Sequence, residues 1–181
     1  MTGCSKNGVP YPPKTGGESR VTMSHMMQPQ DANPAGIVHG GVVMKHIDDA
    51  AGVVALRHTR CNVVTASIDR LDFHNPAFIG NLLSLKASLN LVGSTSMEVG
   101  VRVETEDLKT GEVRHTASAY LTFVALDDAF RPRPVPPLLL ETDEERRRNR
   151  QAQARRRVRL AEKTRETSCR TDPEACHAPQ E

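Results

Sequence analysis

The sequence predicts an α+β fold in which one antiparallel sheet of about five strands wraps around a central helix, with a charged helix at the C-terminal end. Three observations support this. The elements occur in the order one strand, one helix and four long strands. Short, turn-rich links join the later strands, which favours antiparallel pairing. The apolar face of a single sheet must be covered, and only one internal helix is available to cover it.

The strand segments are rich in Val, Leu, Thr and Ser and contain runs of two-residue alternation. In residues 97–104, apolar and other positions alternate cleanly, as on a half-exposed strand. Turn residues lie between the segments, at residues 75–81, 93–94 and 109–111. The expected strands are residues 21–27, 62–73, 82–91, 97–106 and 113–126.

The central helix is expected over residues 40–56. Its apolar stripe has the spacing of one buried helix face and consists of Val43, Ile47, Ala50, Ala51 and Val54. Successive rotations of 100° place Asp48 at the edge of this stripe and Asp49 opposite it, beside Lys45. We therefore interpret Asp49 as a solvated partner of Lys45. Asp48 is the better catalytic candidate, because partial burial can position a carboxylate against a substrate.

A polar loop leads into this helix. Its Asn33-Pro34 step is biased away from helical geometry, and Gly40-Gly41 opens the helix. The first N–H groups of a helix have no partner within it and attract negative charge, including charge that develops on an oxygen during a reaction. Together with a carboxylate two turns later, this pattern predicts a hydrolase site. We interpret His39 as a residue that fixes the loop by hydrogen bonding rather than as a base.

Composition excludes several other classes. The 24 basic and 22 acidic residues nearly balance. Residues 141–166 contain ten basic and six acidic residues, so that segment carries +4 and the rest of the chain −2. The main body is therefore not a nucleic-acid-binding surface. No apolar run approaches the roughly 18 residues of a membrane span, and we expect neither a signal peptide nor membrane association.

The cysteines and the tails complete the organisation. The four cysteines match no zinc spacing, so we expect no metal, a cytoplasmic location and a free thiol at Cys61. Residues 1–19 and 167–181 are expected to be disordered tails. The folded domain is expected over residues 20–137, and residues 138–166 form a solvated, charged helix packed loosely on it.

Several motifs share one order and spacing. The first runs through the loop and helix and reads Asn33-x-x-Gly36-x-x-His39-Gly40-Gly41-x-x-Met44-x-x-x-Asp48. Others are Asp72-Phe73-x-x-Pro76-x-x-x-Gly80, Gly93-Ser94-Thr95-Ser96-Met97-Glu98 and Thr122-Phe123-Val124-Ala125-Leu126-Asp127. Together they resemble the acyl-CoA thioesterases of the hotdog fold, in particular the bacterial acyl-CoA hydrolases and the brain-type cytosolic enzyme. The resemblance covers residues 20–137.

The resemblance implies a set of roles. Asp48 would be the catalytic acid, and Asn33 would serve the same site from a partner subunit in a homodimer, with a trimer of dimers as the full assembly. The amide of Gly41, with His39 and Gly40 beside it, would polarise the thioester carbonyl. The substrate would supply its own coenzyme A, with no separate cofactor, and the turn near its coenzyme A moiety would be Gly93, Ser94, Thr95 and Ser96.

This chain departs from the family at two positions. Relatives often carry arginine where Ser94 stands, so the phosphate contact that the resemblance implies is not expected from residue 94. Asn81 replaces a common aspartate.

Three activities remain open. The first is hydrolysis of acyl-CoA, with Asp48 as general base or nucleophile. The second is hydration or dehydration of an acyl thioester, for which His39 and Asp48 would supply base and acid. The third is acyl-CoA binding without catalysis. The Asn33 and double-glycine pattern favours hydrolysis.

Overall fold

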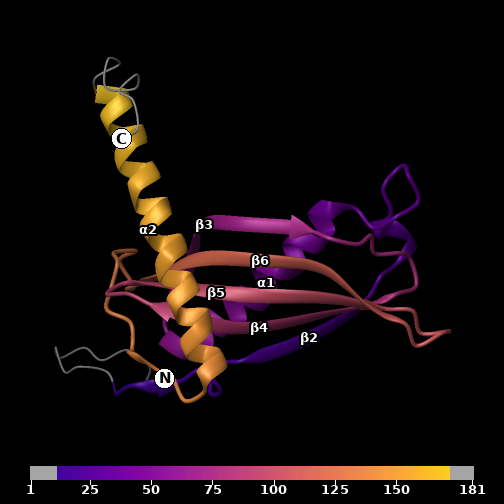
Figure 1. Ribbon diagram of the computed structural model, residues 1–181, viewed down its shortest axis with the longest axis horizontal. Coiled ribbons are helices and arrows are strands. Elements are labelled where there is room, and N and C mark those ends of the chain that lie inside the picture. Colours follow the sequence, from indigo (N-terminus) through magenta and orange to yellow (C-terminus); the bar gives the residue numbers. More distant parts are fainter. Residues whose placement is uncertain (1–11, 172–181) are drawn as a thin grey trace.

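The computed structural model describes residues 12–171 (Figure 1). In chain order its elements are β1 (Lys14–Thr15), β2 (Val21–Met26), the 3-10 turn η1 (Pro29–Asp31), α1 (Gly40–Thr59), β3 (Asn62–Phe73), β4 (Leu82–Val92), β5 (Ser96–Glu106), β6 (Val113–Leu126), β7 (Leu138–Leu139) and α2 (Asp143–Thr171). The five long strands and the central helix lie where the sequence predicts them, within a few residues. Within the described residues, no helix is long and apolar enough to cross a membrane.

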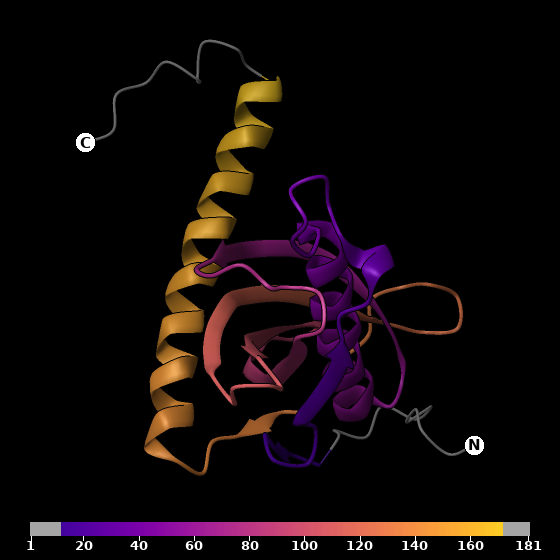
Figure 2. The ribbon, with the colours of Figure 1, turned by 90° about the vertical axis from the view of Figure 1, so that its right-hand side faces the viewer.

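One five-stranded sheet in the order β2-β4-β5-β6-β3 forms the body, and every neighbouring pair is antiparallel. The sheet curls around α1, which lies on its concave side (Figure 2). β2 and β3 are the two edges, and β3 is twice as long as β2 (12 and 6 residues). The predicted α+β architecture is therefore confirmed, and β3 is a long edge that has no second partner strand among the described residues.

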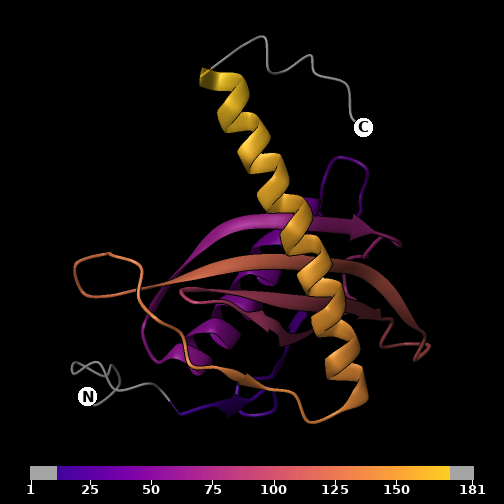
Figure 3. The same ribbon diagram turned by 60° about the vertical axis from the view of Figure 1, so that its left-hand side comes forward.

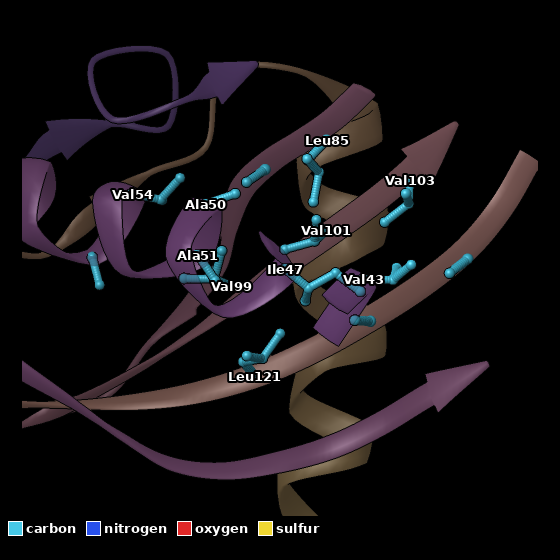
Figure 4. Close-up of a cluster of buried hydrophobic side chains, with 14 of the residues drawn as sticks. Val43, Ile47, Ala50, Ala51, Val54, Leu85, Val99, Val101, Val103 and Leu121 are labelled. Atoms are coloured by element: carbon cyan, nitrogen blue, oxygen red, sulfur yellow. The ribbon is translucent and has the colours of Figure 1, made fainter. Parts of the chain in front are cut away.

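The core lies between α1 and the concave face of the sheet. The expected stripe of α1 is buried there and meets inward-facing residues such as Val99, Val101 and Leu121 (Figure 4). Many of the contacting residues are small and fully buried: Ala50, Ala51, Ala55, Ala117, Ala119 and Ala125. Small side chains allow the helix axis to approach the sheet closely, so α1 packs tightly against the sheet.

The second helix, α2, crosses the convex face of the sheet (Figure 3). It is anchored by ion pairs that reach the sheet: Arg155 Nη2 lies 2.6 Å from Glu98 Oε1, and Arg159 pairs with Asp69. The guanidinium of Arg155 also lies 3.7 Å from the centre of the Tyr120 ring. Glu98 is 3% exposed. The expectation of a loosely packed, solvated helix is therefore wrong for the part of α2 that crosses the sheet.

The expected boundaries also need correction. β1 lies within the predicted N-terminal tail and pairs in parallel with β7, while Ser19 is fully buried. The part of that tail within residues 12–19 is therefore folded, because it closes one end of the domain; residues 1–11 lie outside the described residues. α2 continues to Thr171, beyond the predicted end at 166. Cys61 is disulfide-bonded, and not the free thiol that was expected.

Gly100 on β5 tests how α2 is supported. A Cβ atom there would lie 2.5 Å from Nδ2 of Asn90, an amide that donates to Glu98 beneath α2. We expect Gly100→Ala to displace Asn90 and to lower the free energy of unfolding by about 1–3 kcal/mol, as overpacking does. Gly52→Ala is the matched control, because its Cβ would meet Phe123 at an ordinary 3.9 Å. That variant should gain about 0.5–1 kcal/mol from helix propensity. Equal denaturation midpoints for the two variants would contradict this account.

His58 links three segments and makes stability depend on pH. Its Nε2 donates to the Pro136 carbonyl at 2.8 Å, which leaves Nδ1 to accept from Ser19 Oγ at 3.2 Å. Burial is the main cause that lowers the pKa of His58 below its ordinary 6.5. As the pH falls below about 6.5, the unfolded chain therefore takes up a proton that the folded chain resists, and the folded state loses stability.

We expect the free energy of unfolding to decrease between pH 7 and 5, and to decrease less steeply in His58→Gln, which keeps a donor but does not titrate. The pKa values of His46 and His115 are also lowered, mainly by burial, so the variant keeps part of the slope. Denaturant titrations at several pH values measure the difference. Identical slopes for the two proteins would rule out His58 as a contributor.

Candidate functional site

Asp48 lies near the middle of α1 and is held by a residue of the sheet. Thr65 on β3 donates from Oγ1 to Asp48 Oδ1 at 2.6 Å, and the aspartate is half-buried. Asp49 points elsewhere and pairs with Lys45 at 2.7 Å. The predicted distinction between the two aspartates agrees with this geometry. Thr65 was not singled out in the sequence, because a threonine on a half-exposed strand has no local signal of function.

The loop before α1 holds Asn33 in a fixed orientation. Its Oδ1 accepts hydrogen bonds from the N–H of Ala35 at 2.9 Å and of Ile37 at 3.3 Å. Its backbone N–H donates to the Ile37 carbonyl at 2.8 Å. Because the oxygen is used within the loop, the Nδ2 group is the part of this side chain that remains to donate to a water or a substrate.

His39 caps the start of α1. Its backbone is extended, and its Nδ1 accepts from the N–H of Gly41 at 2.9 Å. This agrees with the interpretation of His39 as a residue that fixes the loop. It also means that the Gly41 amide already has a partner in this structure. A substrate carbonyl would have to replace the imidazole nitrogen in order to use that amide.

A cavity of about 350 Å³ opens beside the start of α1. Its lining is mostly apolar and consists of Asn33, Ile37, Val38, Gly40, Val43, Phe73, His74, Asn75, Pro76, Ala77 and Thr116. Asp48 and Thr65 do not line it. Asp48 lies eight residues beyond Gly40, about 12 Å along the helix axis. Within one chain, therefore, Asn33 and Asp48 do not share this cavity, although both are expected to take part in the same chemistry.

Comparisons with known proteins decide the family. Residues 35–112 match the thioesterase superfamily. YkhA of Bacillus subtilis, an uncharacterized acyl-CoA thioester hydrolase, is 43% identical over 128 residues, which are 71% of this chain and 74% of the relative. The chain belongs to the acyl-CoA thioester hydrolase family. It spans only 36% of the length of the mouse cytosolic acyl coenzyme A thioester hydrolase, with 36% identity over 75% of this chain.

Solved structures of the family share this fold. An apo-hexameric acyl-CoA thioesterase superposes with a TM-score of 0.81 at 38% identity, and the match covers 83% of this chain and 97% of the other. The acyl-CoA hydrolase of Staphylococcus aureus, solved with butyryl coenzyme A and coenzyme A, gives a TM-score of 0.81 at 35% identity, with coverage of 87% and 96%. The hotdog fold inferred from the motifs is thus confirmed.

The predicted coenzyme A turn of this thioesterase-family chain lies apart from the Asn33 cavity. Gly93 N–H donates to the Ser96 carbonyl at 2.7 Å, and the Ser94 and Thr95 carbonyls each accept a backbone hydrogen bond at 3.0 Å. One residue at this turn could not be identified from the sequence. Arg156 of α2 packs against Gly93, since a Cβ on the glycine would lie 3.3 Å from both of its terminal nitrogens. A cation therefore lies beside the turn although Ser94 is not arginine.

Among the described residues, no three His, Cys, Asp or Glu side chains are grouped so that they could hold a metal ion.

Proposed function

We propose that this protein hydrolyses the thioester of acyl-coenzyme A to a free acid and coenzyme A. The observation that carries the proposal is the Asp48 carboxylate, which Thr65 holds in place on the same helix whose start presents backbone amides. In the Staphylococcus aureus hydrolase, an asparagine, an aspartate and a threonine have each been replaced by alanine, and they are spaced 15 and 17 positions apart. Asn33, Asp48 and Thr65 have the same two spacings.

Each group has a chemical task in this proposal. Asp48 acts as general base for water or attacks the carbonyl carbon itself, and Thr65 fixes the carboxylate so that its other oxygen faces the substrate. The Gly41 N–H exchanges the His39 ring for the thioester oxygen and stabilises the negative charge that develops there. In the general-base route, water adds to the carbonyl carbon, the C–S bond breaks, and the thiolate leaving group takes up the proton.

The working unit in this proposal is a homodimer that pairs two β3 strands. Thr65 lies in the N-terminal half of β3, whereas the cavity that contains Asn33 is bordered by His74 and Pro76, just beyond the C-terminal end of the strand. Antiparallel pairing of two β3 strands brings the first half of one strand beside the end of the other. Asn33 of the partner subunit would then face Asp48. Relatives described as hexameric support a trimer of such dimers.

The remaining assignments concern coenzyme A and location. We assign the Gly93–Ser96 turn to the coenzyme A moiety, with Arg156 as the cation for a phosphate in place of an arginine at position 94. We place the enzyme in fatty acyl metabolism of the cytoplasm because the mouse relative is cytosolic. The disulfide at Cys61 is the feature that argues for an oxidising compartment instead.

The purified full chain should be tested on acyl-CoA substrates of increasing length, with released thiol measured. We expect release of free coenzyme A from at least one chain length. Hydration of an enoyl thioester without thiol release would instead support the hydratase alternative. The Asn33 and double-glycine pattern favours hydrolysis over that alternative. Tight binding of every acyl-CoA without turnover would support a binding module.

A further inference from the structure

The C-terminal part of α2 extends beyond its own sheet. α2 crosses the strands and continues past β3 into open space (Figures 1 and 2). Among the described residues, the pair between Arg159 and Asp69 of β3 is the ion pair nearest the C-terminal end of α2 that reaches the sheet. The side chains of residues 160–168 are all exposed. We call residues 160–171 the projecting segment; as helix it is about 18 Å long, and its first turn, at Glu162, still borders a groove on this chain's own sheet.

A groove runs along the anchored part of the same helix. It has a volume of about 770 Å³ and lies between one face of α2 and the convex surface of β3 and β6; we call it the α2 groove. Ala154 leaves space along the helix wall. Val158 and Ile68 are apolar lining residues that are 57% and 43% exposed. The groove is therefore long, open and partly apolar, and it lies over the two strands nearest the free edge.

We propose that the projecting segment of a second copy occupies this groove. The proposal rests on the β3-paired homodimer of the proposed function. Pairing two β3 edges continues the sheet, so both convex surfaces join on one side. The projecting segment of each α2 then crosses the line where the two β3 strands meet. Because strands are about 4.8 Å apart, its length of about 18 Å covers about three strands of the partner subunit. The first two of these are β3 and β6, which form the floor of the groove.

The direction of the groove sets a register for the pairing. α2 crosses β3 at Asp69, and the groove extends from there toward Asp72 and His74. Two packed helices lie about 8–10 Å apart, and a strand rises about 3.3 Å per residue. The α2 helix of the second copy therefore crosses β3 about three residues beyond Asp69, near Asp72. The two-fold axis then passes between Asp69 and Asp72.

The same register predicts an independent feature. A two-fold axis between positions 69 and 72 pairs Thr65 with Pro76 of the partner subunit, since both pairs of numbers add to 141. Pro76 borders the cavity that contains Asn33. One register therefore fills the α2 groove and also brings Asn33 of one chain to Asp48 of the other. The groove was not used to place Asn33, so this agreement supports the proposal.

Photocrosslinking on the full chain tests the contact. A benzophenone amino acid at position 158, which lines the groove, should give a dimer-sized band on a denaturing gel after irradiation. Mass spectrometry should locate the crosslink within residues 160–168 of the other chain. The control places the same probe at Arg157, an exposed neighbour that does not line the groove, and should give no such band. Crosslinks from position 158 only to its own chain, or to another part of the partner, would overturn the proposal.

A truncation gives the second test. A chain that ends at Glu162 keeps the anchors of Arg155 and Arg159 and the groove-lining Glu162 but loses most of the projecting segment. In sedimentation over a dilution series, its dimer dissociation constant should rise at least tenfold, whereas a chain that ends at Thr171 should match the full chain. An unchanged constant would contradict the proposal. At protein concentrations that restore the dimer, hydrolysis by the truncated chain should return. Loss of the projecting segment can therefore be distinguished from failure of the proposed chemistry, in which hydrolysis is absent at every concentration.

Discussion

Asp48→Asn is expected to lower kcat/KM for acyl-CoA by about 10³-fold, within the range that a positioned acid or base contributes. The amide is isosteric and can still accept the hydrogen bond of Thr65, so the geometry around it is retained. What it loses is the ability to take a proton or to attack a carbonyl. Thiol release measured under saturating and limiting substrate, with circular dichroism to confirm folding, gives the result.

Asp49→Asn is the matched control, since it is the same substitution one residue along the helix. It removes the exposed pair with Lys45, and such pairs contribute about 0.3–0.5 kcal/mol. Hydrolysis by this variant should equal that of the parent protein. If Asp48→Asn retained near-parental turnover while Asp49→Asn lost it, the helical phase argument and the assignment of Asp48 would both be wrong.

Local patterns predicted the parts of the fold that depend on local geometry. Strand-forming composition with runs of two-residue alternation, bounded by turn residues, located β3 and β6 to the residue. Likewise, the 100° rotation per helical residue placed Asp48 at the edge of the buried stripe of α1 and Asp49 opposite it. The interpretation of His39 as a residue that fixes the loop by hydrogen bonding agrees with its bond to the Gly41 N–H.

Features that depend on distant residues could not be predicted. Arg155 and Glu98 are 57 positions apart, and Arg159 and Asp69 are 90 apart. No periodicity in an arginine-rich segment indicates which of its arginines will meet a buried carboxylate, so α2 was expected to be loosely packed. Thr65 is similar, because its role arises only when β3 and α1 are packed together.

The division of the site between subunits is the second large effect. If Asn33 and Asp48 of one chain serve different sites, a dimer of Asn33→Ala with Asp48→Asn contains one doubly altered site and one intact site. If they serve the same site, both sites of that dimer are damaged. Each variant alone should be almost inactive, which gives a low background.

The decisive measurement is thiol release by oligomers assembled from equal amounts of the two variants. Random pairing makes half of the dimers mixed, and each mixed dimer has one intact site of two, so about a quarter of the parental activity should return. The control mixes either variant with an Asn33→Ala, Asp48→Asn double variant and should stay inactive. Activity no higher than that control, in a mixture shown to contain mixed dimers, would contradict a site shared between subunits.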